Sequence, residues 1–234
     1  MYNFFKIRKQ ETLSVDLEKS ISEANYTVID TELTGLNERK DSIISMGAVK
    51  MIGSKIDLSK NFNKLIKPEA KFKSESVVIH GITPSDVSEL PAIDSILSEF
   101  AEFCGDDILI GHCVSIDMAF INREMKRVFG NPMPNPVIDT FFIYEWIRTQ
   151  TPSKPCFSYV PKDSGLYEIA KCFEIPVRGA HDALTDAFIT AQIFQRFIPA
   201  LINLGIKNLG ALLKVGHPEK GGDKNSKSGL ISNF

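Results

Sequence analysis

Residues 28–36 of this chain read V-I-D-T-E-L-T-G-L. Together with Tyr26 and Thr27 this stretch forms a β-branched and aromatic run, which predicts a buried strand that ends in a Thr-Gly turn. Because side chains alternate along a strand, Asp30 and Glu32 project from the same face. Two such anions repel each other unless a cation lies between them. Carboxylates without a neighbouring histidine or thiolate favour Mg²⁺ or Mn²⁺ over zinc. By itself, however, this pair is more typical of a solvated strand end.

The segments around this strand predict an α/β fold. Periodicity and turn residues indicate strands at residues 26–30, 44–52, 62–66, 107–112 and 137–139. The predicted helices cover residues 92–104, 115–129, 141–148, 164–174, 182–199 and 206–215. Ser115 is the expected N-cap of the second helix. The first three strands have short connections and predict an antiparallel meander. The later alternation of helices and strands predicts a mixed sheet with helices on both faces.

Composition excludes several classes of protein. The chain has 234 residues, of which 43% are hydrophobic and 24% charged, as in ordinary globular proteins and unlike collagen-like or disordered chains. Its 27 Lys and Arg against 29 Asp and Glu give a net charge of −2, so no strongly basic field exists to hold a polyanion. The four cysteines form no C-x-x-C pair, which argues against a disulfide scaffold or zinc cluster. Without a leader or membrane-length apolar run, we expect a cytoplasmic protein that contacts no membrane.

The chain divides into three predicted parts. Residues 1–25 are mixed and charged and predict an N-terminal arm or short amphipathic helix. Residues 26–200 form the main domain, and residues 201–234 form a C-terminal helix followed by a tail rich in Gly, Lys and Ser. Within the main domain, residues 151–165 are the longest segment expected to lack regular structure.

Two further segments carry acidic residues at element boundaries. In G-H-C-V-S-I-D-M-A-F-I, residues 111–121, Asp117 lies in the first turn of a helix that follows a buried strand. An acid there complements the helix dipole, or it brings a third carboxylate to the same sheet edge. In H-D-A-L-T-D-A, residues 181–187, Asp182 is the expected helix cap. His181 would then project from the preceding loop and Asp186 from the first turn, so that both reach one spot.

Together these segments resemble a known family. The chain order Asp30, Glu32, Asp117, His181 and Asp186 is similar to that of the DEDDh 3′–5′ exonucleases, which include the proofreading epsilon subunits of bacterial replicative polymerases. The resemblance runs from about Tyr26 to Phe197. It includes the stretches H-G-I-T at 80–83, G-H-x-V-S-x-D at 111–117 and I-D-T at 138–140.

The resemblance implies a ribonuclease H-like fold, an α/β mixed five-stranded sheet of order 3-2-1-4-5 flanked by helices. It implies two Mg²⁺ ions, which Mn²⁺ can replace, at the end of the central strand. It assigns their ligands as Asp30, Glu32, Asp117 and Asp186, and makes His181 the general base. Two cations can stabilise both the attacking and the leaving oxygen of a phosphoryl displacement.

The family also implies that the turn after the first acidic pair grips the 3′ end. The predicted substrate-binding residues are Thr34, Gly35 and Leu36. We expect Gly35 to permit close backbone approach and Leu36 to wedge against the last base. His80 and Asp139 are expected to be structural.

The chain departs from its relatives at two positions near these motifs, where Leu33 replaces a common threonine and Cys113 a common asparagine. We expect these changes to tune activity. The predicted function is metal-dependent 3′–5′ hydrolysis of single-stranded DNA, which releases nucleoside 5′-monophosphates, with a role in proofreading or repair. An RNase T-like or oligoribonuclease-like exoribonuclease shares all five residues, so single-stranded RNA 3′ ends are an alternative partner. A DNA polymerase subunit is a candidate partner. An alternative function of a different kind is that of a catalytically silent binding subunit.

Overall fold

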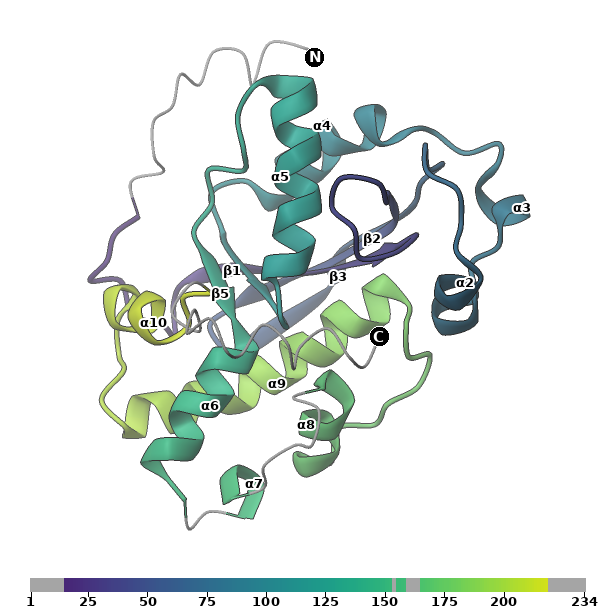
Figure 1. Ribbon diagram of the computed structural model, residues 1–234. Coiled ribbons are helices and arrows are strands. Elements are labelled where there is room, and N and C mark those ends of the chain that lie inside the picture. Colours follow the sequence, from purple (N-terminus) through teal and green to yellow (C-terminus); the bar gives the residue numbers. More distant parts are fainter. Residues whose placement is uncertain (1–14, 153–154, 159–164, 219–234) are drawn as a thin grey trace.

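In the computed structural model, which describes residues 15–152, 155–158 and 165–218, the chain folds around one five-stranded sheet (Figure 1). Its strands are β1 (Asn25–Leu33), β2 (Ile43–Ile52), β3 (Lys55–Leu65), β4 (Ile108–Gly111) and β5 (Val137–Asp139). Their order is β3-β2-β1-β4-β5. The first three strands pair antiparallel, whereas β4 runs parallel to both β1 and β5. The predicted mixed sheet, its order and its ribonuclease H-like arrangement are confirmed.

Helices cover both faces of the sheet (Figure 1). One face packs against α4 (Ile93–Cys104) and α5 (Ser115–Phe129). The other packs against α6 (Thr140–Gln150), α8 (Leu166–Cys172), α9 (Ala183–Asn203) and α10 (Leu209–Val215). The other helices in the described residues are α2 (Ser74–His80), α3 (Pro84–Val87) and α7 (Pro155–Ser158). No helix in the described ranges combines the length and apolar character needed to cross a bilayer.

The central strand β1 contributes side chains to two separate hydrophobic cores. Tyr26 and Val28 are fully buried in the core on the α9 side. Ile29 and Leu33 point the other way, into the core beneath α4 and α5. By the same alternation, the even-numbered Asp30 and Glu32 continue the face that α9 covers.

A glycine in β2 allows α9 to start directly on the sheet. Gly47 is paired with Asp30, and a Cβ added to Gly47 would collide with the backbone of Ala183 and Leu184. Glycine is therefore required for this close approach. Asp182 caps the helix as predicted, because its side chain accepts a hydrogen bond from the Thr185 N–H at 2.9 Å. The first turn of α9 is thus held against Asp30.

Several predicted boundaries were wrong. Val114, and not Ser115, is the N-cap of α5, and it has no side-chain cap, because the preceding turn is fixed by Asp139 instead. Strand β3 begins at Lys55, seven residues before its predicted start, because it pairs along β2 from the hairpin onward. Helices α2 and α3 were not predicted, and α7 lies within the segment expected to lack regular structure. The last two helices cover Ala183–Asn203 and Leu209–Val215 instead of 182–199 and 206–215.

The N-terminal segment joins the core on the α10 side. Residues 1–14 lie outside the described part of the chain, and residues 15–24 form turns rather than a helix. Ile21 is fully buried, and Ser20 forms a bridge with Asn208 just before α10. The described part of the predicted arm therefore packs onto the main domain. The division of the chain at residues 26 and 201 stays a prediction.

Candidate active site

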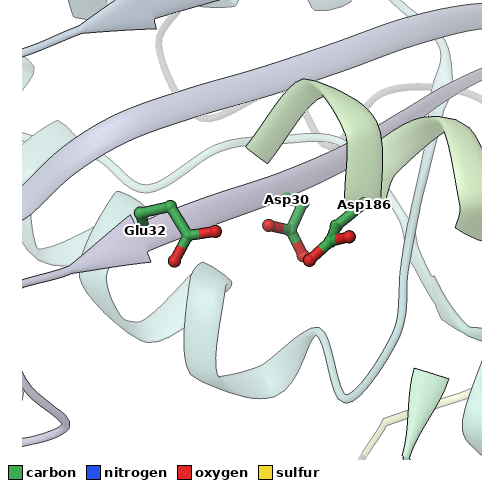
Figure 2. A group of neighbouring side chains, drawn as sticks. All are labelled: Asp30, Glu32 and Asp186. Carbon is green, nitrogen blue, oxygen red and sulfur yellow. The ribbon is translucent and has the colours of Figure 1, made fainter. Parts of the chain in front are cut away.

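Three carboxylates converge at the end of β1 (Figure 2). Asp30 and Glu32 extend from the strand and Asp186 from the first turn of α9, and each offers an oxygen within 4.8 Å of the others. The close approach of α9 at Gly47 brings these groups together, although Asp186 lies far along the chain. The structure therefore gathers three of the four predicted acidic residues into one group.

The charge of this group is poorly compensated by the protein. Burial, followed by the charges of Asp117 and Glu32, holds the pKa of Asp30 well above its ordinary range. Burial and the charge of Asp186 raise the pKa of Glu32 to about 8. Burial also raises the pKa of Asp186, against the opposing effect of a hydrogen bond from Tyr167. Either protons or cations must offset this concentration of negative charge.

The fourth predicted acid, Asp117, lies in the first turn of α5 on the other side of β1. Thr31 points to that side, and its hydroxyl donates to Asp117 Oδ1 at 2.6 Å. Burial raises the pKa of Asp117 to about 6, although the Thr31 hydrogen bond lowers it. Asp117 shares the cavity of the other acids but stays outside their tight group.

His181 occupies the loop before α9, as predicted. It has a left-handed backbone, with φ of 63°, and its N–H donates to the Tyr167 hydroxyl at 2.8 Å. The rings of Tyr167 and His181 meet edge to face, with 5.2 Å between their centroids. His181 lines the same cavity as the four acids. All five predicted catalytic residues therefore share one cavity.

This cavity has a volume of about 370 Å³. The turn after β1 contributes Gly35 and Leu36 to its wall, and Leu36 is 41% exposed, unlike an ordinary core leucine. Thr34, in contrast, is fully buried, and its hydroxyl accepts a hydrogen bond from the Ser42 N–H at 2.9 Å. Thr34 thus supports the turn from behind, whereas Gly35 and Leu36 face the cavity.

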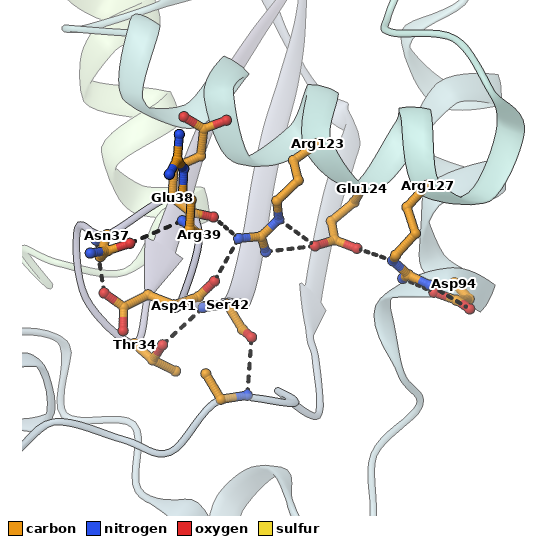
Figure 3. Close-up of polar contacts among 11 residues, drawn as sticks. Thr34, Asn37, Glu38, Arg39, Asp41, Ser42, Asp94, Arg123, Glu124 and Arg127 are labelled. Carbon is orange, nitrogen blue, oxygen red and sulfur yellow. Dashed lines mark hydrogen bonds and ion pairs between the residues drawn. The ribbon is translucent and has the colours of Figure 1, made fainter.

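Helix α5 anchors the loop that continues from this turn (Figure 3). The Arg123 guanidinium donates to the Asp41 carbonyl at 2.9 Å and also to the Glu38 carbonyl. Glu124, which is buried, accepts from Arg123 Nε at 2.8 Å and from Arg127 Nε at 2.7 Å. Because Arg123 holds two backbone carbonyls at once, it fixes the far end of the loop relative to α5.

Asp139 and His80 have the positions expected of structural residues. Asp139 accepts hydrogen bonds from the backbone N–H groups of Cys113, Val114 and Phe141 at 2.9, 3.0 and 2.9 Å. It therefore orders the turn that leads into α5, as predicted. His80 lies in the cavity wall, where its Nδ1 accepts from the Ile82 N–H at 3.0 Å.

No sequence motif predicted the residues that support the site. Alternation along β1 could have placed Thr31 opposite Asp30 and Glu32, toward the helix that carries Asp117. Tyr167 and Arg123 belong to no motif, and their contacts arise only when α8 and α5 pack against the rest of the domain.

The sheet has the strand order of a ribonuclease H-like fold, and the clustered carboxylates lie on its central strand. The exonuclease family model of RNase T matches residues 27–194, and the chain belongs to this family. It contains an exonuclease domain, which makes it a phosphodiester hydrolase by family.

Relatives support this assignment. The DNA polymerase III epsilon subunit of Aquifex aeolicus is 32% identical over 193 residues, which cover 82% of this chain and 90% of that protein. The PolC-type DNA polymerase III of Staphylococcus haemolyticus is 32% identical over 192 residues, but the match spans only 12% of its length.

Solved structures share the fold. Escherichia coli exonuclease I in complex with a dT13 oligonucleotide superposes with a TM-score of 0.66 at 17% identity, over 78% of this chain and 43% of that one. Exonuclease X in complex with 5′ overhanging duplex DNA superposes with a TM-score of 0.59 at 22% identity. The match covers 81% of this chain and 98% of that one.

The acidic group fits the divalent-metal dependence of this family. Its donors are all carboxylate oxygens, which suit hard cations. Asp186 Oδ1 is buried and finds no hydrogen-bond partner within the described part of the chain, although buried polar atoms are normally paired. A divalent cation would satisfy this oxygen and offset the raised pKa values of its neighbours.

Proposed function

We propose that this chain is a 3′–5′ exonuclease that acts on single-stranded DNA and releases nucleoside 5′-monophosphates. The observation that carries this proposal is the group of Asp30, Glu32 and Asp186, which shares one cavity with Asp117 and His181 on an exonuclease fold. The intact set of acids disfavours a catalytically silent subunit.

In this proposal Asp30, Glu32, Asp117 and Asp186 hold two Mg²⁺ ions, which Mn²⁺ can replace. When bound, these ions polarise the scissile phosphate and stabilise the charge that develops on it. They also supply the positive potential that a net charge of −2 does not provide. Thr31 orients the Asp117 carboxylate through its 2.6 Å hydrogen bond.

His181 is the proposed general base. An imidazole can accept a proton from the attacking water at neutral pH. The left-handed backbone of His181 and its N–H bond to Tyr167 fix the direction from which the ring enters the cavity. The proton passes from water to the imidazole as the water oxygen attacks phosphorus. The bond to the 3′ oxygen of the penultimate nucleotide breaks, and that oxygen leaves with the electron pair and takes up a proton from solvent.

Gly35 and Leu36 are the proposed contacts for the terminal nucleotide. Leu36 offers an exposed apolar surface for the last base, and Gly35 leaves room for the sugar to approach the backbone. Since some relatives are polymerase subunits, a polymerase is a proposed partner, and we propose a cytoplasmic location.

The test is a time course on 5′-labelled DNA and RNA oligonucleotides of matched sequence, free or annealed, with Mg²⁺, Mn²⁺ or a chelator. We expect stepwise, distributive shortening of free DNA that requires metal and that a 3′-phosphate blocks. Asp186→Asn should abolish shortening, whereas Asp57→Asn, which changes a partly exposed acid on β3 that does not line the cavity, should not. Internal cuts, or shortening from the 5′ end, would refute the proposal. Preferential digestion of RNA would assign the chain to the exoribonuclease alternative.

A further inference from the structure

The hydroxyl of Tyr167 links two residues of the candidate site. Tyr167 lies on α8, and its hydroxyl donates to Asp186 Oδ2 at 2.5 Å while it accepts from the His181 N–H at 2.8 Å. The same N–H also points at Asp186 Oδ2, at 3.2 Å. These three groups therefore form a closed set of hydrogen bonds at the start of α9.

As a result the two oxygens of Asp186 have different surroundings. Oδ2 receives both hydrogen bonds, whereas Oδ1 is buried without a partner among the described residues. The residue as a whole is only 5% exposed. A buried acceptor left unpaired costs free energy. Because Oδ2 is occupied, Oδ1 is the oxygen left to bind a cation.

We propose that Tyr167 is a positioning residue, which fixes the Asp186 carboxylate so that it presents Oδ1 alone to the metal and which anchors the backbone of His181. This inference rests on the metal site of the proposed function. Partners of metal ligands that lie outside the coordination sphere orient those ligands, and their removal commonly weakens metal binding by about 10- to 100-fold. Without the hydroxyl, the Asp186 carboxylate is free to rotate and Oδ2 competes with Oδ1.

The contribution of the hydroxyl can be separated from that of the ring. Tyr167→Phe removes the two hydrogen bonds but keeps the edge-to-face contact with the His181 ring, whose centroid lies 5.2 Å away. Tyr144 supplies a matched control, since its hydroxyl donates to the Cys156 carbonyl at 3.2 Å and Tyr144 does not line the cavity. Tyr144→Phe therefore removes a hydroxyl hydrogen bond within the same layer of the protein without touching the site.

The experiment is calorimetric titration of Mn²⁺ into the metal-free full chain, in the wild type and in Tyr167→Phe, Tyr144→Phe and Asp186→Asn. We expect Tyr167→Phe to weaken Mn²⁺ binding by about 10- to 100-fold, and Tyr144→Phe to bind like the wild type. Thermal melts check that both variants fold. In turnover assays at saturating Mn²⁺, Tyr167→Phe should lower kcat and leave the KM for an oligonucleotide nearly unchanged.

The two hypotheses fail in different ways. If Asp186→Asn loses Mn²⁺ binding while Tyr167→Phe binds like the wild type, the metal site stands and the role of Tyr167 is refuted. Equal weakening in Tyr167→Phe and Tyr144→Phe would also refute it, because the effect would then come from packing. If Asp186→Asn itself keeps wild-type affinity, the metal site of the proposed function is refuted as well.

Discussion

Lys73 and Asp41 form an ion pair against the turn at Gly35, with 2.6 Å between Lys73 Nζ and Asp41 Oδ2. The Asp41 side chain is only 4% exposed, and its carboxylate also accepts a hydrogen bond from the Asn37 N–H at 2.8 Å. A Cβ on Gly35 would lie 2.5 Å from Asp41 Oδ2, so a side chain at this position would have to displace the ion pair. The ion pair thus ties the segment before α2 to the turn that lines the cavity.

Lys73→Met should destabilise the protein and loosen this turn. It leaves the buried Asp41 carboxylate without its cation, and because Lys73 itself is half-exposed we expect a cost of about 1 to 2 kcal/mol. Urea denaturation measures this loss, and the KM for an oligonucleotide should rise. The control is Lys71→Met, which changes an exposed lysine of the same segment. Equal stability of the two variants would show that the ion pair does not hold the turn.

The metal-free protein should lose stability as the pH rises from about 5 to 8. Burial and the charge of Asp186 raise the pKa of Glu32 from its ordinary 4.5 to about 8, so the folded chain keeps a proton that the unfolded chain releases. Where the folded state binds more protons, the free energy of unfolding falls with rising pH. The raised pKa values of Asp117, about 6, and Asp139, about 7, act in the same direction.

Calorimetric melts in chelator at a series of pH values measure this fall. The stabilising contribution of Glu32 is fully present below about pH 4.5 and is lost as the pH passes through about 8. Glu32→Gln should flatten the dependence of the melting temperature on pH. For the wild type, Mn²⁺ at pH 8 should restore the melting temperature that the metal-free protein has at low pH. A melting temperature that rises over this range in chelator would contradict the charge state assigned to the site.

His181→Ala should lower turnover by about 10² to 10⁴, which is the usual contribution of a positioned general base. Its Mn²⁺ affinity should change little, because the Tyr167 hydroxyl still holds Asp186 Oδ2. Single-turnover kinetics and calorimetric titration measure the two quantities separately. A variant that loses Mn²⁺ affinity in proportion to its rate would make His181 a metal ligand.

Cys113→Asn should stabilise the protein. Cys113 has a φ of 53°, a left-handed conformation that costs most residues about 1 kcal/mol and that asparagine tolerates better. We expect a melting temperature about 1 to 3 °C higher. Cys172→Asn is the control, since Cys172 lies in α8 with an ordinary helical backbone, where asparagine brings no such gain. A decrease on Cys113→Asn would show that the thiol makes packing contacts that outweigh the backbone strain.

Local sequence patterns predicted the mixed sheet with helices on both faces, and the resemblance to the exonuclease family implied the strand order and the five catalytic residues that share one cavity. Alternation along β1 was enough to place Asp30 and Glu32 on one face, and capping rules were enough to place Asp182 at the start of α9. Both rules depend only on neighbours within a few residues. The resemblance to the exonuclease family then linked these local signals to Asp117 and His181.

The way in which these residues are held depends on contacts across the fold. The separation of Asp117 from the other three acids depends on the two faces of β1, and the distinct roles of the two Asp186 oxygens depend on a tyrosine from α8. The anchoring of the Glu38 and Asp41 carbonyls by Arg123 likewise needs α5 to pack beside the loop. These contacts join segments that are distant in the chain, and they use backbone groups and single hydroxyls. Because such groups occur throughout every sequence, they give no signal that identifies their partners. Periodicity records which face of an element is buried, whereas partners across the fold are set by packing.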